Sequence, residues 1–305
     1  MNIANATKIV RLGRPQYLVG DFLLFTMGAL LALLSGAQFV LGKFILGYSI
    51  LFFAHLSVHY SNDYYDFGVD KLNKPTPISG GSGVLVNNPE LKEFSKWFSI
   101  VLMALSMILT AIFTVAFRYP ITFFLFLLFG NLLAWFYTAP PLKLVYRRLG
   151  EVSNVIAVVI FMGTGYFALM GTLDLLFFIF CIPVIFLQLI FINSFEIPDM
   201  EGDSLGGKRT WIVLYGRGFG FRVIAVSTIL STASFLLISL TGVFSSTINF
   251  QVLAFISLIP LVLGVVELVK KPLDRESATR FSMINVALLF LMSILIDAYF
   301  LYLIK

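Results

Sequence analysis

Nine apolar runs divide the sequence, each about as long as the roughly 20 residues that a helix needs to cross a bilayer. Backbone inside the hydrocarbon layer must satisfy its own hydrogen bonds, so such runs predict a bundle of membrane-spanning helices. Only 12% of the 305 residues are charged, whereas a soluble domain has about 25%. The expected helices lie at about 17–37, 41–62, 95–117, 120–138, 152–171, 175–196, 218–241, 249–269 and 281–303.

The basic residues predict how this bundle is oriented. With the N-terminus in the cytoplasm, 18 of the 21 Lys and Arg fall on the cytoplasmic side. Only Lys43, Arg118 and Lys305 fall on the other side. Positive charge is retained on the cytoplasmic face of membrane proteins, so we expect a multi-pass protein of the cell membrane with its C-terminus on the opposite side. No small-residue cleavage site follows the first apolar run, which is therefore expected to be a retained helix.

Two aspartate motifs end two of the apolar runs. Asn62, Asp66 and Asp70 follow one another at steps of four, and Asp199 and Asp203 repeat that step 133 residues after Asp66. Side chains at i and i+4 share one face of a helix. A lone acid at a helix end often only sets the depth of the helix, but two matched groups at one membrane face predict a common site. Carboxylate oxygens facing each other suit Mg²⁺ bridged by a diphosphate.

The position of the two motifs also predicts an internal repeat. Helices one to four, about 17–138, and helices five to eight, about 152–269, each carry a motif after their second helix. The loops that close the two sets look alike, with Pro140-Pro141-Leu142-Lys143 in one and Lys271-Pro272-Leu273-Asp274 in the other. We expect a single membrane domain over 1–305. Its parallel repeat, completed by a ninth helix at 281–303, would surround a central cavity open to the cytoplasmic side.

Basic side chains near the motifs are candidates for binding the diphosphate. The positive-inside rule alone accounts for many of them. A site for a Mg²⁺–diphosphate nevertheless needs cations as well as carboxylates, because Lys or Arg neutralises the phosphate charge that the metal does not neutralise. The predicted contacts are Lys74, Lys143, Arg147, Lys208 and Arg209.

Aromatic and histidine side chains beside the motifs give weaker signals. Tyr64, Tyr65 and Tyr137 lie at the cytoplasmic ends of helices, where a ring face could stabilise a carbocation. His55 and His59 precede the first motif, and we expect them to be packed or hydrogen-bonded, with His55 able to line the cavity. Three acids inside apolar runs have no matching motif and receive no role: Asp21, Glu267 and Asp297.

Three motifs in this order resemble those of the UbiA superfamily of intramembrane aromatic prenyltransferases. The first is Asn62-Asp63 with Asp66 and Asp70, and the second is Asp199-Met-Glu-Gly-Asp203 continuing into Gly207-Lys208-Arg209-Thr210. The third is Tyr137-Thr-Ala-Pro-Pro-Leu-Lys143 with Arg147. The resemblance implies that Asn62 and the four aspartates hold Mg²⁺ and diphosphate. It also implies that these aspartates and Tyr137 are catalytic, and that the prenyl tail lies in the apolar cavity.

Within that superfamily the loop Pro75-Thr-Pro-Ile-Ser-Gly-Gly-Ser-Gly83 looks most like the menaquinone-type branch, which prenylates dihydroxynaphthoate. Many other members carry an arginine before the proline motif of this loop, whereas Thr76 precedes Pro77 here. This difference argues against the hydroxybenzoate, haem O and chlorophyll branches.

The expected function is therefore Mg²⁺-dependent transfer of a polyprenyl group from its diphosphate to an aromatic acceptor such as a quinone precursor. Transfer to a glycerol-phosphate lipid alcohol is an alternative, although an aliphatic hydroxyl needs a base and the sequence offers no evident one. A transporter is a further alternative, but transporter sites lie near the bilayer midplane. The expected partners are the two substrates and the bilayer, with no nucleic acid and no obligate protein partner.

The loop over residues 71–94 is a candidate lid. Gly80, Gly81 and Gly83 would allow the backbone changes that closure requires, although a passive connector is the simpler interpretation. Because a polyprenyl chain enters from lipid, we also expect a lateral opening between helices.

Overall fold

The chain folds as a bundle of long helices in the computed structural model, which describes residues 3–244 and 247–305. Within these residues, eight helices are long and apolar enough to cross a membrane. They span Pro15–Leu34, Leu41–Tyr65, Pro89–Ala116, Gly150–Met170, Leu175–Leu205, Arg217–Thr241, Phe250–Lys270 and Arg275–Ile304. No strand occurs in the described part of the chain, which confirms the predicted all-helical membrane class.

The fourth expected span, at about 120–138, is shorter than predicted and is not among these eight. It is α7, which has 15 residues from Ile121 to Trp135. At 1.5 Å per residue such a helix reaches roughly 22 Å, less than the roughly 30 Å of a hydrocarbon core. Pro120 precedes its first residue, and the chain turns after Trp135 toward Pro140-Pro141. Because proline cannot continue a helix, the sequence confines α7 on both sides.

The remaining elements are short. In chain order the elements are α1 (Ile3–Leu12), η1 (Pro15–Tyr17), α2 (Leu18–Leu34), α3 (Leu41–Tyr65), α4 (Phe67–Asp70), α5 (Val84–Asn87), η2 (Pro89–Leu91), α6 (Lys92–Ala116), α7 (Ile121–Trp135), η3 (Leu144–Arg147), α8 (Gly150–Met170), α9 (Leu175–Glu196), η4 (Ile197–Asp199), α10 (Met200–Leu205), α11 (Trp211–Tyr215), α12 (Arg217–Thr241), α13 (Phe250–Lys270) and α14 (Arg275–Ile304).

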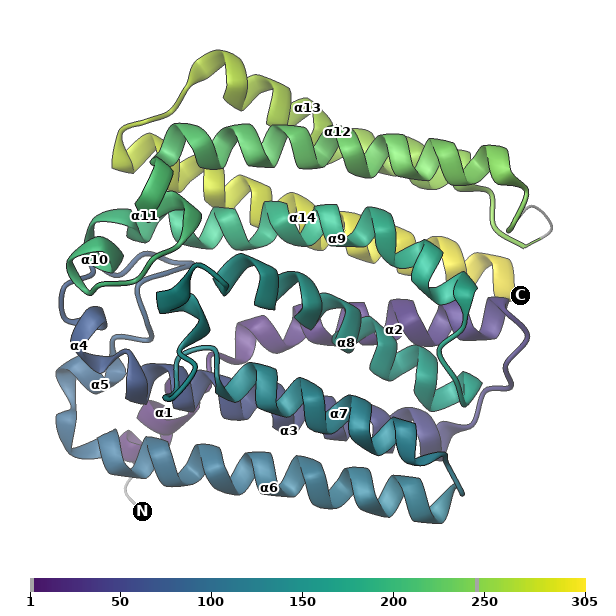
Figure 1. The fold of residues 1–305 in the computed structure, drawn as a ribbon, viewed down its shortest axis with the longest axis horizontal. Coiled ribbons are helices and arrows are strands. Elements are labelled where there is room, and N and C mark those ends of the chain that lie inside the picture. The colour runs from purple at the N-terminus through teal and green to yellow at the C-terminus, as the bar shows by residue number, and fades with distance from the viewer. Residues whose placement is uncertain (1–2, 245–246) are drawn as a thin grey trace.

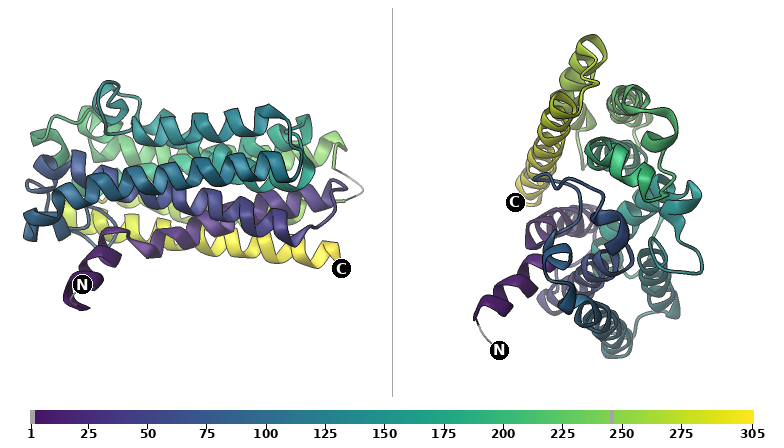
Figure 2. Two further views of the ribbon diagram at one scale, coloured as in Figure 1. Left: turned by 90° about the horizontal axis from the view of Figure 1, so that it is seen from below. Right: turned by 90° about the vertical axis from the view of Figure 1, so that its left-hand side faces the viewer.

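The long helices run nearly side by side, and the short elements gather at one end of the bundle (Figures 1 and 2). That end carries α4, α5, α10 and α11, and the C-terminus lies at the other end (Figure 1). We call it the motif end, because it contains both Asn62–Asp70 and Asp199–Asp203. Each motif follows the second long helix of its half, α3 or α9. The parallel repeat that this order indicates stays a prediction.

Two glycines let α2 and α8 cross at backbone contact. A Cβ added to Gly28 would lie 1.8 Å from the Met162 carbonyl oxygen, and one added to Gly165 would lie 2.0 Å from the Phe25 carbonyl oxygen. Small residues allow this approach between membrane helices, where packing replaces the hydrophobic effect. The crossing brings together two helices that both line the cavity described below.

The largest apolar cluster fills the end of the bundle opposite the motifs. Phe177 at the start of α9, Phe250 at the start of α13 and Phe300 at the end of α14 are all buried in it. Aromatic rings of this size fill the space between helices there. Open space is left at the motif end.

Candidate active site

Both aspartate motifs line one cavity of about 360 Å³. Its walls come from α2, α3, α7, α8, α9 and α14, and residues 78–81 of the loop after α4 also border it. The lining includes every residue predicted to bind metal: Asn62, Asp66, Asp70, Asp199 and Asp203. The two groups lie 133 residues apart in sequence and meet in space.

Lys208 joins the two motifs directly. Its amine lies 2.9 Å from Asp66 Oδ2 and 3.3 Å from Asp203 Oδ1. The hydroxyl of Tyr146 donates to Asp66 Oδ1 at 2.7 Å, and the Asn73 amide donates to Asp203 Oδ1 at 3.0 Å. Burial alone would lower the pKa of Lys208, but Asp66 and Asp203 raise it well above its ordinary value. The amine is therefore a fixed positive charge between the motifs.

The candidate lid contacts the second motif. The Ser79 hydroxyl donates to Asp199 Oδ1 at 2.8 Å, and the Gly80 amide donates to Asp199 Oδ2 at 2.7 Å. Tyr17, at the start of the first span, donates to the Ile78 carbonyl at 2.8 Å. The loop thus lies over the cavity, with its backbone aimed at a carboxylate.

Asp70 is buried beside other carboxylates, whose charge the nearby cations do not fully offset. Burial and the nearby carboxylates of Asp63 and Asp66 raise the pKa of Asp70 to about 8, against the opposing charges of Lys208 and Arg14. Carboxylate and amide oxygens are the ligands that Mg²⁺ accepts, and a divalent cation would stabilise the ionised form of Asp70. The residues present therefore fit a magnesium site. Among the described residues no three acid, histidine or cysteine side chains are placed to enclose a metal by themselves.

Tyr137 lies in the cavity wall just after α7. Burial, with Glu196 nearby, raises the pKa of Tyr137 well above its ordinary value, so its phenol stays neutral. The next residue, Thr138, donates its hydroxyl to Asn62 Oδ1 at 2.8 Å. The short α7 and the turn after it thus position an aromatic ring beside the first motif.

The other two tyrosines proposed to face a carbocation point elsewhere. The ring of Tyr64 lies 5.1 Å from the Lys92 amine, and that of Tyr65 packs edge-on against Trp135 at 5.7 Å. Neither tyrosine borders the cavity. Of the three, only Tyr137 is placed as predicted.

Of the five basic residues predicted to bind diphosphate, only Lys208 lines the cavity. The Lys143 amine lies 5.3 Å from the Tyr146 ring centroid, and the Arg147 guanidinium donates to the Pro141 carbonyl at 3.0 Å. Lys74 and Arg209 are exposed and do not line the cavity. As diphosphate contacts, these four residues stay predictions.

Four site residues were not found from the sequence: Arg14, Asn73, Ser79 and Tyr146. Arg14 lines the cavity and pairs with Asp63, to which Ser82 also donates. Asp63 also borders the cavity, where its carboxylate is held by Arg14 and Ser82. Asn73 continues the polar face of Asn62, Asp66 and Asp70 by three more residues, and this spacing could have identified it. The contacts of Arg14 and Tyr146 span 49 and 80 residues and left no local signal.

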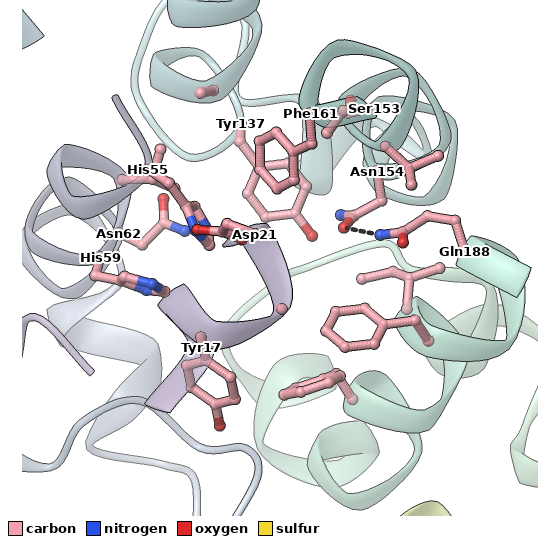
Figure 3. Close-up of a pocket in the computed structure, with 18 of the residues that line it drawn as sticks. Tyr17, Asp21, His55, His59, Asn62, Tyr137, Ser153, Asn154, Phe161 and Gln188 are labelled. Carbon is pink, nitrogen blue, oxygen red and sulfur yellow. Dashed lines mark hydrogen bonds and ion pairs between the residues drawn. The ribbon is translucent and has the colours of Figure 1, made fainter. Parts of the chain in front are cut away.

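The inner part of the cavity is mostly apolar but contains two polar pairs (Figure 3). One pair is Asp21 and His55, and the other is Asn154 and Gln188. His55 lines the cavity, as expected. Asp21 does so too, although it belongs to no motif and was assigned no role.

Comparison with known proteins identifies the family. The sequence profile of the UbiA prenyltransferase family matches residues 22–303. The chain belongs to the UbiA prenyltransferase family. This confirms the family and enzyme class indicated by the three motifs.

Two curated relatives are chloroplast chlorophyll synthases. The one from Oryza sativa subsp. japonica is 29% identical over 161 residues, and the one from Avena sativa is 31% identical over 163 residues. Each match covers 51% of this chain and 40% of the relative, so the similarity reaches less than half of the relatives' length. The menaquinone-type branch is not confirmed. The similarity also runs against the interpretation of Thr76 as a mark of distance from the chlorophyll branch.

Solved structures share the fold over nearly the whole chain. A UbiA homolog from Archaeoglobus fulgidus bound to GPP and Mg²⁺ superposes with a TM-score of 0.65 at 20% identity, covering 95% of this chain and 99% of that one. A structure of digeranylgeranylglyceryl phosphate synthase gives 0.66 at 17% identity, covering 97% and 99%. An apo UbiA homolog from Aeropyrum pernix K1 gives 0.65 at 16% identity, covering 92% and 98%. The TM-scores and the coverage show a common fold.

Proposed function

We propose that this protein transfers a polyprenyl group from a polyprenyl diphosphate to a hydroxylated aromatic acceptor, in a Mg²⁺-dependent reaction that releases diphosphate. The observation that carries the proposal is the meeting of both aspartate motifs around Lys208 at the mouth of a largely apolar cavity. Such a cavity offers charge for a diphosphate and apolar walls for its prenyl tail. The A. fulgidus relative, which has this fold, binds GPP and Mg²⁺.

Mg²⁺ would be held by Asn62, Asp66, Asp70, Asp199 and Asp203. When bound, it supplies neutralisation of the charge that develops on the departing diphosphate. Mg²⁺ in proteins is commonly held by one or two carboxylates together with phosphate oxygens. This mode suits a site in which no three acidic side chains converge among the described residues.

The chain's own residues provide the remaining chemistry. Lys208 keeps its proton. Its positive charge can stabilise the negative charge that develops on the departing diphosphate. Tyr137 presents a neutral ring whose face can stabilise positive charge on the allylic carbon. The apolar walls exclude water, which would otherwise capture that carbon.

Because the loop over residues 75–83 resembles that of the menaquinone-type branch, the proposed acceptor is a dihydroxynaphthoate-like quinone precursor. The membrane arrangement proposed for the reaction is a multi-pass protein of the cell membrane, with the motif end and the N-terminus cytoplasmic. Both substrates can be tested in one assay that measures product formation from geranylgeranyl diphosphate in the presence of Mg²⁺. The acceptors to compare are dihydroxynaphthoate, hydroxybenzoate, chlorophyllide and a glycerol-phosphate lipid. Product from the glycerol-phosphate lipid alone would contradict the aromatic acceptor.

Replacing either Asp66 or Asp199 by Asn tests the metal assignment. Each change removes one charged ligand, and we expect turnover to fall by about 10²-fold or more, the usual effect of losing one group that stabilises the transition state. Product formation in proteoliposomes measures it. Glu276→Gln is the matched control, because Glu276 is an exposed acid at the motif end. Near-normal turnover by Asp66→Asn or Asp199→Asn would show that these carboxylates do not hold the metal.

A further inference from the structure

Asp21 and His55 form a carboxylate–imidazole pair inside the membrane-spanning part of the cavity. Asp21 lies on α2 and is buried, and its carboxylate contacts Nδ1 of His55 on α3. Both residues border the cavity, and 17% of the His55 side chain is exposed. An ionisable group at this depth is costly and usually serves a function. Neither residue of this pair belongs to the aspartate motifs.

The contact with Asp21 determines which nitrogen of His55 is available. A carboxylate that accepts from Nδ1–H leaves Nε2 as the hydrogen-bond acceptor of the ring. The ring is held in place by Phe161 at 5.1 Å and by the ring of His59 at 4.5 Å, measured between centroids. His55 thus offers an oriented base in an otherwise apolar chamber.

A second observation also points to a polar ligand here. His59 Nε2 is buried and has no hydrogen-bond partner among the described residues, although His59 lines the same cavity. A buried polar atom without a partner is unfavourable, and a hydroxylated ligand beside the histidines would supply one. On the α8 and α9 side, Gln188 donates to Asn154 at 3.4 Å, so a second polar group faces the chamber (Figure 3).

We propose that His55, held by Asp21, binds the hydroxyl group of the aromatic acceptor and takes its proton during prenyl transfer. The chamber between the two polar pairs is then the acceptor site, and the aspartate motifs bind the diphosphate of the donor. This inference rests on the proposed function and assigns the base that the sequence did not reveal.

The proposed transfer replaces the bond between C1 and the diphosphate oxygen by a carbon–carbon bond. The acceptor hydroxyl gives its proton to His55 Nε2, while a ring carbon forms a bond to C1 of the prenyl group. The bond from C1 to the diphosphate oxygen breaks, and its electron pair leaves with the diphosphate. The substituted ring carbon then loses its hydrogen as a proton to the diphosphate, and His55 returns its proton to the oxygen. The products are the prenylated aromatic and protonated diphosphate.

The test compares a hydroxylated acceptor with its methyl ether in the variants His55→Leu, His55→Gln and Asp21→Asn. Wild-type protein should strongly prefer the free hydroxyl. His55→Leu and Asp21→Asn should lower kcat/KM for it by about 10²-fold, the usual contribution of a general base, and should abolish the preference over the ether. His55→Gln keeps a hydrogen-bond acceptor, so its acceptor KM should change less than its kcat.

The donor side supplies the control. KM for geranylgeranyl diphosphate and binding of an unreactive diphosphate analogue with Mg²⁺ should stay as in wild type for all three variants. Asp297→Asn removes another buried membrane acid that lies outside the cavity, and its activity should be unchanged.

Three outcomes distinguish a failure of this inference from a failure of the proposed function. A preference for the free hydroxyl that survives in active His55→Leu or Asp21→Asn protein would overturn the inference. If the variants lose both donor binding and acceptor turnover, the Asp21–His55 pair has a purely structural role, and the inference is overturned as well. If wild-type protein prenylates none of the hydroxylated aromatics, the proposed function itself fails.

Discussion

Single residues at the motif end are fitted around carboxylates with little spare room. Gly81 has φ of +73°, and a Cβ placed on it would lie 2.3 Å from Asp70 Oδ2. Gly202 is equally restricted, since its Cβ would lie 1.9 Å from Asn73 Oδ1. Glycine thus brings the loop backbone against the aspartates.

Gly81→Ala should therefore disable the site. The added methyl would displace Asp70 and would also impose a left-handed conformation that costs an L-residue roughly 1–2 kcal/mol. We expect a large loss of turnover with a modest loss of thermal stability, measured by product formation and by melting in detergent. Gly171→Ala is the control, because Gly171 has φ of +85° but no atom within 4 Å of its added Cβ. Equal losses in both variants would mean that backbone strain alone, and not the clash with Asp70, is responsible.

The sequence revealed the charged half of the site better than its partners. Asn62, Asp66, Asp70, Asp199 and Asp203 were found because a helix turns their fixed spacing into a common face. Tyr146 and Arg14 reach the site through loops far away in sequence, which no local pattern encodes. The basic residues were overpredicted because the positive-inside rule places cations at this end whether or not they contact a ligand.

At the scale of elements, the arrangement of α2 and α8 shapes the cavity. Gly28 and Gly165 bring their backbones together, and the same helices carry Asp21 and Asn154 on the cavity wall. The helix boundaries followed from apolar length, except for α7, which ends at Trp135 because the chain turns there, before the end of its apolar run. The crossing was not predictable, because apolar runs specify helices but not which pairs touch.

Gly28→Ala should separate α2 from α8. Its Cβ would overlap the Met162 carbonyl oxygen, which belongs to backbone and cannot rotate away. Overpacking of this kind costs about 1–3 kcal/mol, so the melting temperature in detergent should fall clearly. Gly42→Ala is the matched control on α3, because its Cβ would lie 3.6 Å from Phe117 in an ordinary contact. A melting temperature unchanged by Gly28→Ala would show that the two helices adjust freely at this point.

At the scale of the whole molecule, the loop after α4 connects parts of the chain that are distant in sequence. It contacts Asp199 through Ser79 and Gly80, and the Lys74 carbonyl accepts a hydrogen bond from Arg275 of α14 at 2.7 Å. The loop therefore covers the cavity from one helix set to the last helix. This arrangement suits the predicted lid, which must open to admit a donor.

Fixing the loop to α14 should block turnover. Pro77 and Glu276 line the same surface pocket, so a Pro77→Cys and Glu276→Cys pair can be joined by a cleavable bifunctional maleimide. The one native cysteine, Cys181, is buried. We expect joining to abolish most activity and cleavage of the linker to restore it, with each single cysteine variant treated alike as the control. Full activity in the joined protein would identify the loop as a passive connector.

The position of Lys208 bears on how a catalytic cycle would begin. Its amine lies between Asp66 and Asp203 and acts as a tethered counter-ion for both. A metal ion arriving alone would have to displace this amine and leave two like charges side by side. A metal already chelated by the donor brings phosphate oxygens to which the amine can transfer its contacts. Joint entry of cation and diphosphate, as one complex, is the order of assembly that this counter-ion favours.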